Sequence, residues 1–104
     1  MTDAGGVSTS LIEKAGVVGA GVMGSGIAEV LAAAGIDVMI VDEAPGKAAA
    51  AVEQIASRQR ARAAAGKISA DSVEKLLARI APVEALDRLA DADLVVEAII
   101  EQIE

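Results

Sequence analysis

The sequence of 104 residues contains no cysteine, histidine, asparagine, phenylalanine, tyrosine or tryptophan. The absence of cysteine excludes disulfides and thiolate metal sites, and it agrees with the cytoplasmic location that we expect. Without histidine or cysteine, no side chain has an unperturbed pKa near 7, so a general base would need a strongly shifted carboxylate or lysine. No arrangement in the sequence indicates such a residue, and we expect neither a catalytic residue nor a metal site.

Basic residues are also scarce, with nine lysines and arginines against sixteen acidic residues and a net charge of -7. This balance makes attraction to nucleic acid or to an anionic membrane surface unfavourable. Hydrophobic residues make up 54% of the chain, but no apolar run reaches the roughly eighteen residues that cross a bilayer. The opening residues lack both the basic and the apolar part of a secretory signal, so we expect residues 1–12 to form a flexible tail.

The first half of the chain has the pattern of a strand, a helix and a second strand. A short apolar run over residues 14–19 predicts a buried parallel strand that ends at glycines. Residues 22–34 predict a helix, which Gly35 would end. The apolar face of this helix is expected to consist of Met23, Ile27, Val30, Leu31 and Ala34. Residues 36–42 are rich in branched aliphatics and predict the second strand, which completes a βαβ unit.

The second half continues the alternation of helices and strands. Residues 45–65 predict an alanine-rich helix with its proline in the first turn, and residues 69–77 predict a serine-capped helix. Residues 80–83 are weakly strand-like, and Pro82 disfavours a central position for that strand. Residues 91–99 predict the last strand. This order predicts an α/β fold in which helices cover both faces of a parallel sheet.

Three glycines, Gly19, Gly21 and Gly24, form the pattern Gly-x-Gly-x-x-Gly between the first strand and the first helix. The first glycine would permit a tight turn, the second would let the backbone approach a pyrophosphate, and the third would allow close helix packing. Free amides at the helix start would face the anion, so that an acidic chain could still bind a dinucleotide. The pattern predicts a Rossmann-type dinucleotide-binding domain over residues 13–104.

Asp42 ends the second predicted strand, eighteen residues beyond Gly24. This is near the spacing expected of the carboxylate that accepts hydrogen bonds from the adenosine ribose. Glu43 follows, so a 2′-phosphate would face two carboxylates, each opposing it by roughly 1 to 4 kcal/mol. We therefore expect NAD(H) and not NADP(H) as the cofactor. Alternatively, the glycines serve only the turn and its packing, and Asp42 is a solvated strand terminus.

The segments GAGVMGSGIAEVLAAAGIDVMIVD and DADLVVEAIIE together resemble the N-terminal domain of the 3-hydroxyacyl-CoA dehydrogenase family, over roughly residues 14–104. The first segment is shared with other Rossmann dehydrogenases, including the 3-hydroxyisobutyrate and 6-phosphogluconate group. The second segment favours the 3-hydroxyacyl-CoA dehydrogenase family among them. The resemblance implies an oxidoreductase that converts (S)-3-hydroxyacyl-CoA to 3-ketoacyl-CoA with NAD. It implies a role in fatty-acid β-oxidation or in short-chain pathways.

The resemblance also assigns cofactor contacts. Asp42 would bind the adenosine ribose, and Ala98 with Glu101 would lie against the nicotinamide half. Glu101 could instead be an exposed glutamate at a helix start, and Glu97 could be a buried strand carboxylate. The residues that would cradle the pyrophosphate are Gly19, Ala20, Gly21, Val22, Met23 and Gly24.

The catalytic residues of the family lie downstream of the matched region. We therefore expect this chain to be the N-terminal part of a larger two-domain enzyme, truncated before the catalytic segment and inactive alone. The missing C-terminal domain would complete the acyl-CoA site and form a homodimer. Arg58, Arg60 and Arg62 lie where relatives place CoA, although a solvated helix face is the alternative. Other open alternatives are a non-catalytic NAD-binding module, a 3-hydroxyisobutyrate-type dehydrogenase and a methyltransferase.

Overall fold

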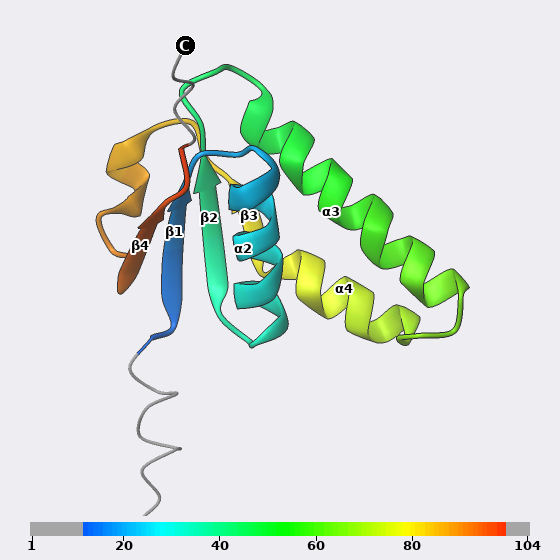
Figure 1. Ribbon diagram of the computed structural model, residues 1–104. Coiled ribbons are helices and arrows are strands. Elements are labelled where there is room, and N and C mark those ends of the chain that lie inside the picture. Colours follow the sequence, from blue (N-terminus) through cyan, green and yellow to red (C-terminus); the bar gives the residue numbers. More distant parts are fainter. Residues whose placement is uncertain (1–11, 100–104) are drawn as a thin grey trace, which may run out of the picture.

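The structure, a computed structural model that describes residues 12–99, is built on a four-stranded parallel sheet (Figure 1). The sheet has the order β3-β2-β1-β4. Its strands are β1 (Lys14–Val18), β2 (Asp37–Val41), β3 (Ile80–Pro82) and β4 (Leu94–Glu97). The helices are α2 (Val22–Ala33), α3 (Lys47–Ala64), α4 (Ala70–Ala78) and the 3₁₀ helix η1 (Leu86–Leu89). The predicted parallel α/β fold is confirmed.

β1 lies between β2 and β4, and its carboxyl end is therefore flanked by the carboxyl ends of both neighbours. Val18 pairs with Val41 on one side and with Glu97 on the other. Just beyond these pairs, the Gly19 amide donates to the Val41 carbonyl at 2.8 Å. In parallel sheets of this kind, ligands bind outside the carboxyl ends of the strands, where the strand order reverses. The order β2-β1-β4 puts that reversal at the end of β1.

The three α-helices pack together on one face of the sheet, as Figure 1 shows. The main core joins Val17, Val38 and Ile40 of the sheet to residues of all three helices, including Ala28, Ile55 and Leu76. On the opposite face a smaller cluster consists of Val41, Val83 and Leu89, with Leu89 belonging to η1. Helices thus cover both faces as predicted, although the described residues place only a 3₁₀ helix on the second face.

The face of α2 that meets the sheet differs from the predicted one. Met23 and Val30 were expected to point inward, but they are 53% and 69% exposed, and Ala34 is also exposed. The buried residues of α2 are Gly24, Ser25, Ala28 and Ala32. Small side chains let the helix axis approach the strands closely, so the larger Ile27 and Leu31 pack along the flanks and remain partly buried.

Two other element boundaries differ from the predicted ones: β4 covers only Leu94–Glu97 of the predicted residues 91–99, and α3 begins later than predicted. Gly46 adopts a left-handed φ of 81° before α3, so Pro45 precedes the helix and does not lie in its first turn as predicted. The predicted cap of α4 is confirmed, because the Ser69 hydroxyl accepts a hydrogen bond from the Ser72 amide at 3.1 Å. Pro82 lies in β3, which is the edge strand beside β2 in the described sheet. No helix of residues 12–99 is long and apolar enough to cross a membrane.

Candidate cofactor-binding site

A cleft of about 680 Å³ opens at the carboxyl edge of the sheet. It lies where the ends of β1, β2 and β4 meet, and its volume suits a small-molecule or cofactor site. The residues that line it are Val18, Gly19, Gly21, Val41, Asp42, Glu43, Lys47, Glu84, Leu86, Ala98 and Ile99. The structure therefore brings the glycine turn, the acid at the end of β2 and the end of β4 into one cavity.

The three motif glycines occupy positions with distinct steric demands. Gly19 has a left-handed φ of 106°, and a Cβ there would lie 3.0 Å from the carbonyl of Ala98. A Cβ on Gly24 would lie 1.7 Å from the carbonyl oxygen of Gly19, so only glycine allows α2 to pack against this turn. Among residues 12–99, no atom lies within 4 Å of the position that a Cβ on Gly21 would take. Gly21 thus leaves an open approach from the cleft to the backbone, as a pyrophosphate would need.

The amino end of α2 begins at the edge of this cleft, where Gly21 is a lining residue and the predicted site residues Val22, Met23 and Gly24 are not. Gly21 is the N-cap residue, and the first intrahelical bond from an amide runs from Ser25 to the Gly21 carbonyl at 2.9 Å. The preceding amides of Val22, Met23 and Gly24 have no partner within the helix itself. The first turn carries no acidic residue, and the described chain provides no side-chain cap for it. This end of α2 therefore keeps its partial positive charge for an anion.

The Asp42 carboxylate connects the end of β2 to the glycine turn. Its Oδ2 accepts a hydrogen bond from the Ala20 amide at 2.8 Å, and its Oδ1 accepts one from the Ala44 amide at 2.9 Å. These two bonds hold the pKa of Asp42 below its usual value, with a smaller contribution from the charge of Lys47. The carboxylate is thus ionised at neutral pH, and each oxygen retains a lone pair that could accept a ribose hydroxyl.

The remaining predicted site residues differ in how they relate to the cleft. The Ala20 amide already donates to Asp42, so it shapes the turn rather than facing the cleft as a free donor. Ala98 is buried, lines the cleft and donates its amide to Val18 at 2.7 Å. Glu97 is exposed at the end of β4, so the alternative of a buried strand carboxylate is wrong. Glu101 lies outside the described residues.

The sequence interpretation missed several residues that line the cleft, above all Lys47, Glu84 and Leu86. Lys47 could have been found, because a basic residue five positions after the acid, at the start of a helix, can turn back towards it. Glu84 and Leu86 reach the cleft through the segment between β3 and η1, whose path no local signal predicts. Within residues 12–99, no group of three or more acidic residues is arranged to bind a metal ion.

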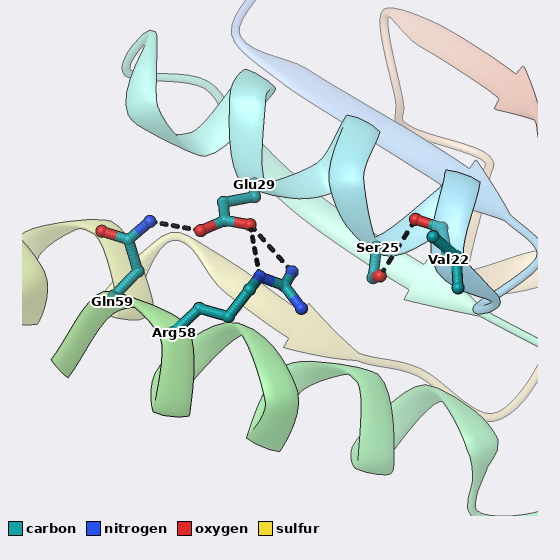
Figure 2. Close-up of polar contacts among 5 residues, drawn as sticks. All are labelled: Val22, Ser25, Glu29, Arg58 and Gln59. Atoms are coloured by element: carbon teal, nitrogen blue, oxygen red, sulfur yellow. Dashed lines mark hydrogen bonds and ion pairs between the residues drawn. The ribbon is translucent and has the colours of Figure 1, made fainter. Parts of the chain in front are cut away.

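A polar contact between α2 and α3 fixes the position of the helix that offers its amides (Figure 2). The Glu29 carboxylate accepts hydrogen bonds from Arg58, at 3.2 Å from Nε and 2.8 Å from Nη2, and another from the Gln59 amide. In the first turn of the same helix, the Ser25 hydroxyl donates to the Val22 carbonyl at 3.3 Å. Arg58 is thus engaged with Glu29, which favours a structural role for it over a CoA contact.

A βαβ unit with a glycine turn, exposed helix amides and an acid at the end of the second strand defines a Rossmann-type dinucleotide-binding domain. Residues 14–104 match the family described as "3-hydroxyacyl-CoA dehydrogenase, NAD binding domain". The chain belongs to this family, which confirms the resemblance and identifies NAD as the cofactor. The match decides against a methyltransferase and against a 3-hydroxyisobutyrate-type dehydrogenase.

Known proteins with similar sequences and structures agree with this assignment. The chain is 39% identical over 93 residues to 3-hydroxyadipyl-CoA dehydrogenase of Escherichia coli K12, covering 89% of this chain and 20% of that protein. It is 38% identical over 93 residues to 3-hydroxybutyryl-CoA dehydrogenase of Bradyrhizobium diazoefficiens, with coverages of 89% and 32%. The crystal structure of 3-hydroxybutyryl-CoA dehydrogenase from Escherichia coli K12 gives a TM-score of 0.83 at 38% identity, with coverages of 88% and 19%. The chain therefore spans only 19% to 32% of these proteins.

Proposed function

We propose that this chain is the NAD-binding part of an enzyme that oxidises (S)-3-hydroxyacyl-CoA to 3-ketoacyl-CoA. The observation that carries the proposal is the cleft in which the start of α2, Asp42 and the end of β4 meet, in a chain of this family. When bound there, NAD supplies the acceptor for the hydride that leaves the substrate carbon. The residues of this chain bind and orient the cofactor.

We assign each part of the cofactor to a region of the cleft or of its edge. The amides of Val22, Met23 and Gly24 would receive the pyrophosphate, and Asp42 would accept the hydroxyls of the adenosine ribose. The nicotinamide half would extend across the end of β1 towards Ala98, where β4 ends. We place Glu101 in that half as well. The dinucleotide would therefore cross the edge of the sheet from β2 to β4.

The acyl-CoA partner, the catalytic groups and the assembly of the enzyme belong to this proposal too. The sequence has no histidine or cysteine to serve as a general base, so we place the catalytic groups outside these residues. Leu94 and Val95 of β4 are 36% and 48% exposed on an edge strand of the described sheet, which suits further elements packing there. We propose a cytoplasmic homodimer for the complete enzyme.

The test is a titration that follows the fluorescence of NADH and of NADPH against this chain. The chain contains no tryptophan or tyrosine, so the nucleotide is the fluorophore that the titration reports. We expect NADH to bind at least about tenfold more tightly than NADPH, because Asp42 and Glu43 oppose a 2′-phosphate. The Asp42→Ala variant should weaken NADH binding by about tenfold or more, the amount expected from lost hydrogen bonds to a charged group.

Asp93→Ala is the matched control for the structural role of Asp42. The Asp93 carboxylate also accepts two backbone hydrogen bonds, from Glu13 at 2.9 Å and Lys14 at 3.0 Å, but it lies at the amino ends of β1 and β4. Its removal should leave the affinity for NADH within about twofold of the original. Equal losses in the two variants, or no loss in Asp42→Ala, would contradict the proposed role of Asp42.

A further inference from the structure

The ribose end of the cleft carries an excess of negative charge. Its lining includes three carboxylates, those of Asp42, Glu43 and Glu84, and among the described lining residues Lys47 alone is basic. The amides of α2 can compensate a pyrophosphate, but their effect is confined to the end of the helix. A second anionic group near Asp42 would therefore depend on Lys47 for an opposite charge.

The backbone between β2 and α3 places Lys47 close to Asp42. The turn is closed at both ends, since Asp42 accepts a hydrogen bond from the Ala44 amide at 2.9 Å and the Ala44 carbonyl accepts one from the Lys47 amide at 3.2 Å. Gly46, with its left-handed φ of 81°, reverses the chain just before Lys47. Lys47 thus begins α3 and lines the same cleft as the two acids that follow β2.

Within residues 12–99, no ion pair engages the charge of Lys47. The four ion pairs formed within residues 12–99 use other cations, namely Arg58, Arg60, Lys75 and Arg79. Lys47 does act on Asp42 at a distance, since its positive charge adds to the two backbone bonds that lower the pKa of that carboxyl. The positive charge of its ammonium group therefore acts on groups inside the cofactor cleft.

We propose that Lys47 is a specificity-determining residue of this cleft, which partly offsets Asp42 and Glu43 and so weakens the rejection of a 2′-phosphate. The inference rests on the proposed binding of NAD in this cleft. In Rossmann domains that bind NADP, a nearby arginine accommodates the 2′-phosphate, and Lys47 carries the same sign of charge. Here Lys47 follows Asp42 by five residues in the same turn. The preference for NAD over NADP therefore depends on the balance between the carboxylates of Asp42 and Glu43 and the ammonium group of Lys47.

The experiment compares NADH and NADPH binding to the Lys47→Gln variant at an ionic strength of about 50 mM. Glutamine keeps much of the side-chain length and the tendency to form a helix while it removes the charge. NADPH should bind about tenfold more weakly and NADH at most about twofold more weakly. The ratio of the dissociation constant of NADPH to that of NADH should therefore rise about fivefold or more. The change should shrink when salt is added, because exposed charges are screened.

Two control variants separate the position of the charge from its sign. Lys67→Gln makes the same change in net charge in the turn between α3 and α4, outside the cleft lining, and should leave the ratio unchanged. Lys47→Arg keeps the charge and should not raise the ratio, since a guanidinium also pairs with a phosphate.

The inference is overturned if Lys47→Gln leaves the ratio unchanged. It is equally overturned if both nucleotides weaken by the same factor, or if Lys67→Gln shifts the ratio as much as Lys47→Gln does. A failure of the unmodified chain to bind NADH would instead contradict the proposed function, and with it this inference. The two failures are therefore distinguishable in one set of titrations.

Discussion

Gly24 lies in the first turn of α2, where a Cβ would come within 1.7 Å of the Gly19 carbonyl oxygen. Because that oxygen belongs to the backbone of the cofactor turn, it can move only if the turn itself moves. Gly26 lies two residues further along the same helix, and no atom of the described part of the chain lies within 4 Å of the corresponding position. These two glycines therefore differ in what they do for the fold, although they belong to the same helix.

We predict opposite results for alanine at the two positions. Gly24→Ala should lower the free energy of unfolding by about 3 kcal/mol and abolish NADH binding, because the turn and the helix must separate. Gly26→Ala should raise the free energy of unfolding by up to about 1 kcal/mol, since alanine favours a helix. Urea unfolding followed by circular dichroism measures both changes. If Gly24→Ala is as stable as Gly26→Ala, the steric role of Gly24 is wrong.

At the scale of elements, α2 is attached to α3 by the contacts of Glu29. The Glu29 side chain is 18% exposed and accepts hydrogen bonds from Arg58 and from Gln59, whose residue is only 4% exposed (Figure 2). Arg58 is about half exposed, so water can replace its partner at little cost. The side-chain amide of Gln59 is buried, so water cannot take the place of Glu29 as its acceptor. Losing this hydrogen bond should therefore cost more stability than losing those from Arg58.

We predict a graded loss of stability when these contacts are removed. Glu29→Ala should lower the free energy of unfolding by about 2 kcal/mol, and Arg58→Ala by less than about 1 kcal/mol. Asp71→Ala is the control, because it removes an exposed ion pair with Lys75 on α4 and should change stability by no more than about 0.5 kcal/mol. The measurement is again urea unfolding by circular dichroism. A harmless Glu29→Ala would show that this contact does not stabilise the packing of α2.

The elements that the sequence predicted well are those with strong local signals. The glycines at residues 19–24 and the Ser69 cap mark where helices begin, whatever the rest of the chain does. The buried face of α2 could not be predicted in this way. Hydrophobicity alone predicts that the large apolar residues face the sheet, whereas the close approach of helix and strands leaves room only for small side chains. The path of η1 depends on a distant partner, since Leu89 packs where Gly16 of β1 has no side chain. Glu84 and Leu86 belong to the segment that leads into η1, so their positions at the cleft could not be predicted from local sequence either.

At the scale of the whole molecule, two aspartates form hydrogen bonds at the opposite ends of β1, one of the two inner strands. Asp93 accepts hydrogen bonds from Glu13 and Lys14 at the start of β1, and Asp42 accepts one from Ala20 just beyond its end. β1 is the strand that pairs with both β2 and β4, so these contacts tie the two halves of the described sheet together. No single local pattern predicts this arrangement, because each aspartate contacts a segment that is remote in sequence.

The same contacts predict how stability depends on pH. The backbone bonds lower the pKa of both carboxyls in the folded chain, chiefly through Ala20 for Asp42 and through Glu13 for Asp93. A lowered pKa contributes stability that is fully present above the unfolded value of about 3.9 and is lost as the pH falls through the folded value. Stability should therefore change little from these groups between about pH 5 and 7, and should fall below about pH 4.

Asparagine variants isolate this contribution from the general neutralisation of an acidic chain. Asp42→Asn and Asp93→Asn should each be less stable than the original at pH 7, because a neutral amide cannot accept two amide bonds as strongly as a carboxylate does. Each should also lose less further stability between about pH 5 and 3, since its titrating group is gone. The double variant should show the shallowest slope, and urea unfolding at a series of pH values measures it. If all four proteins share one slope, the ionised aspartates do not fasten β1, and the pH dependence has its origin in other carboxylates.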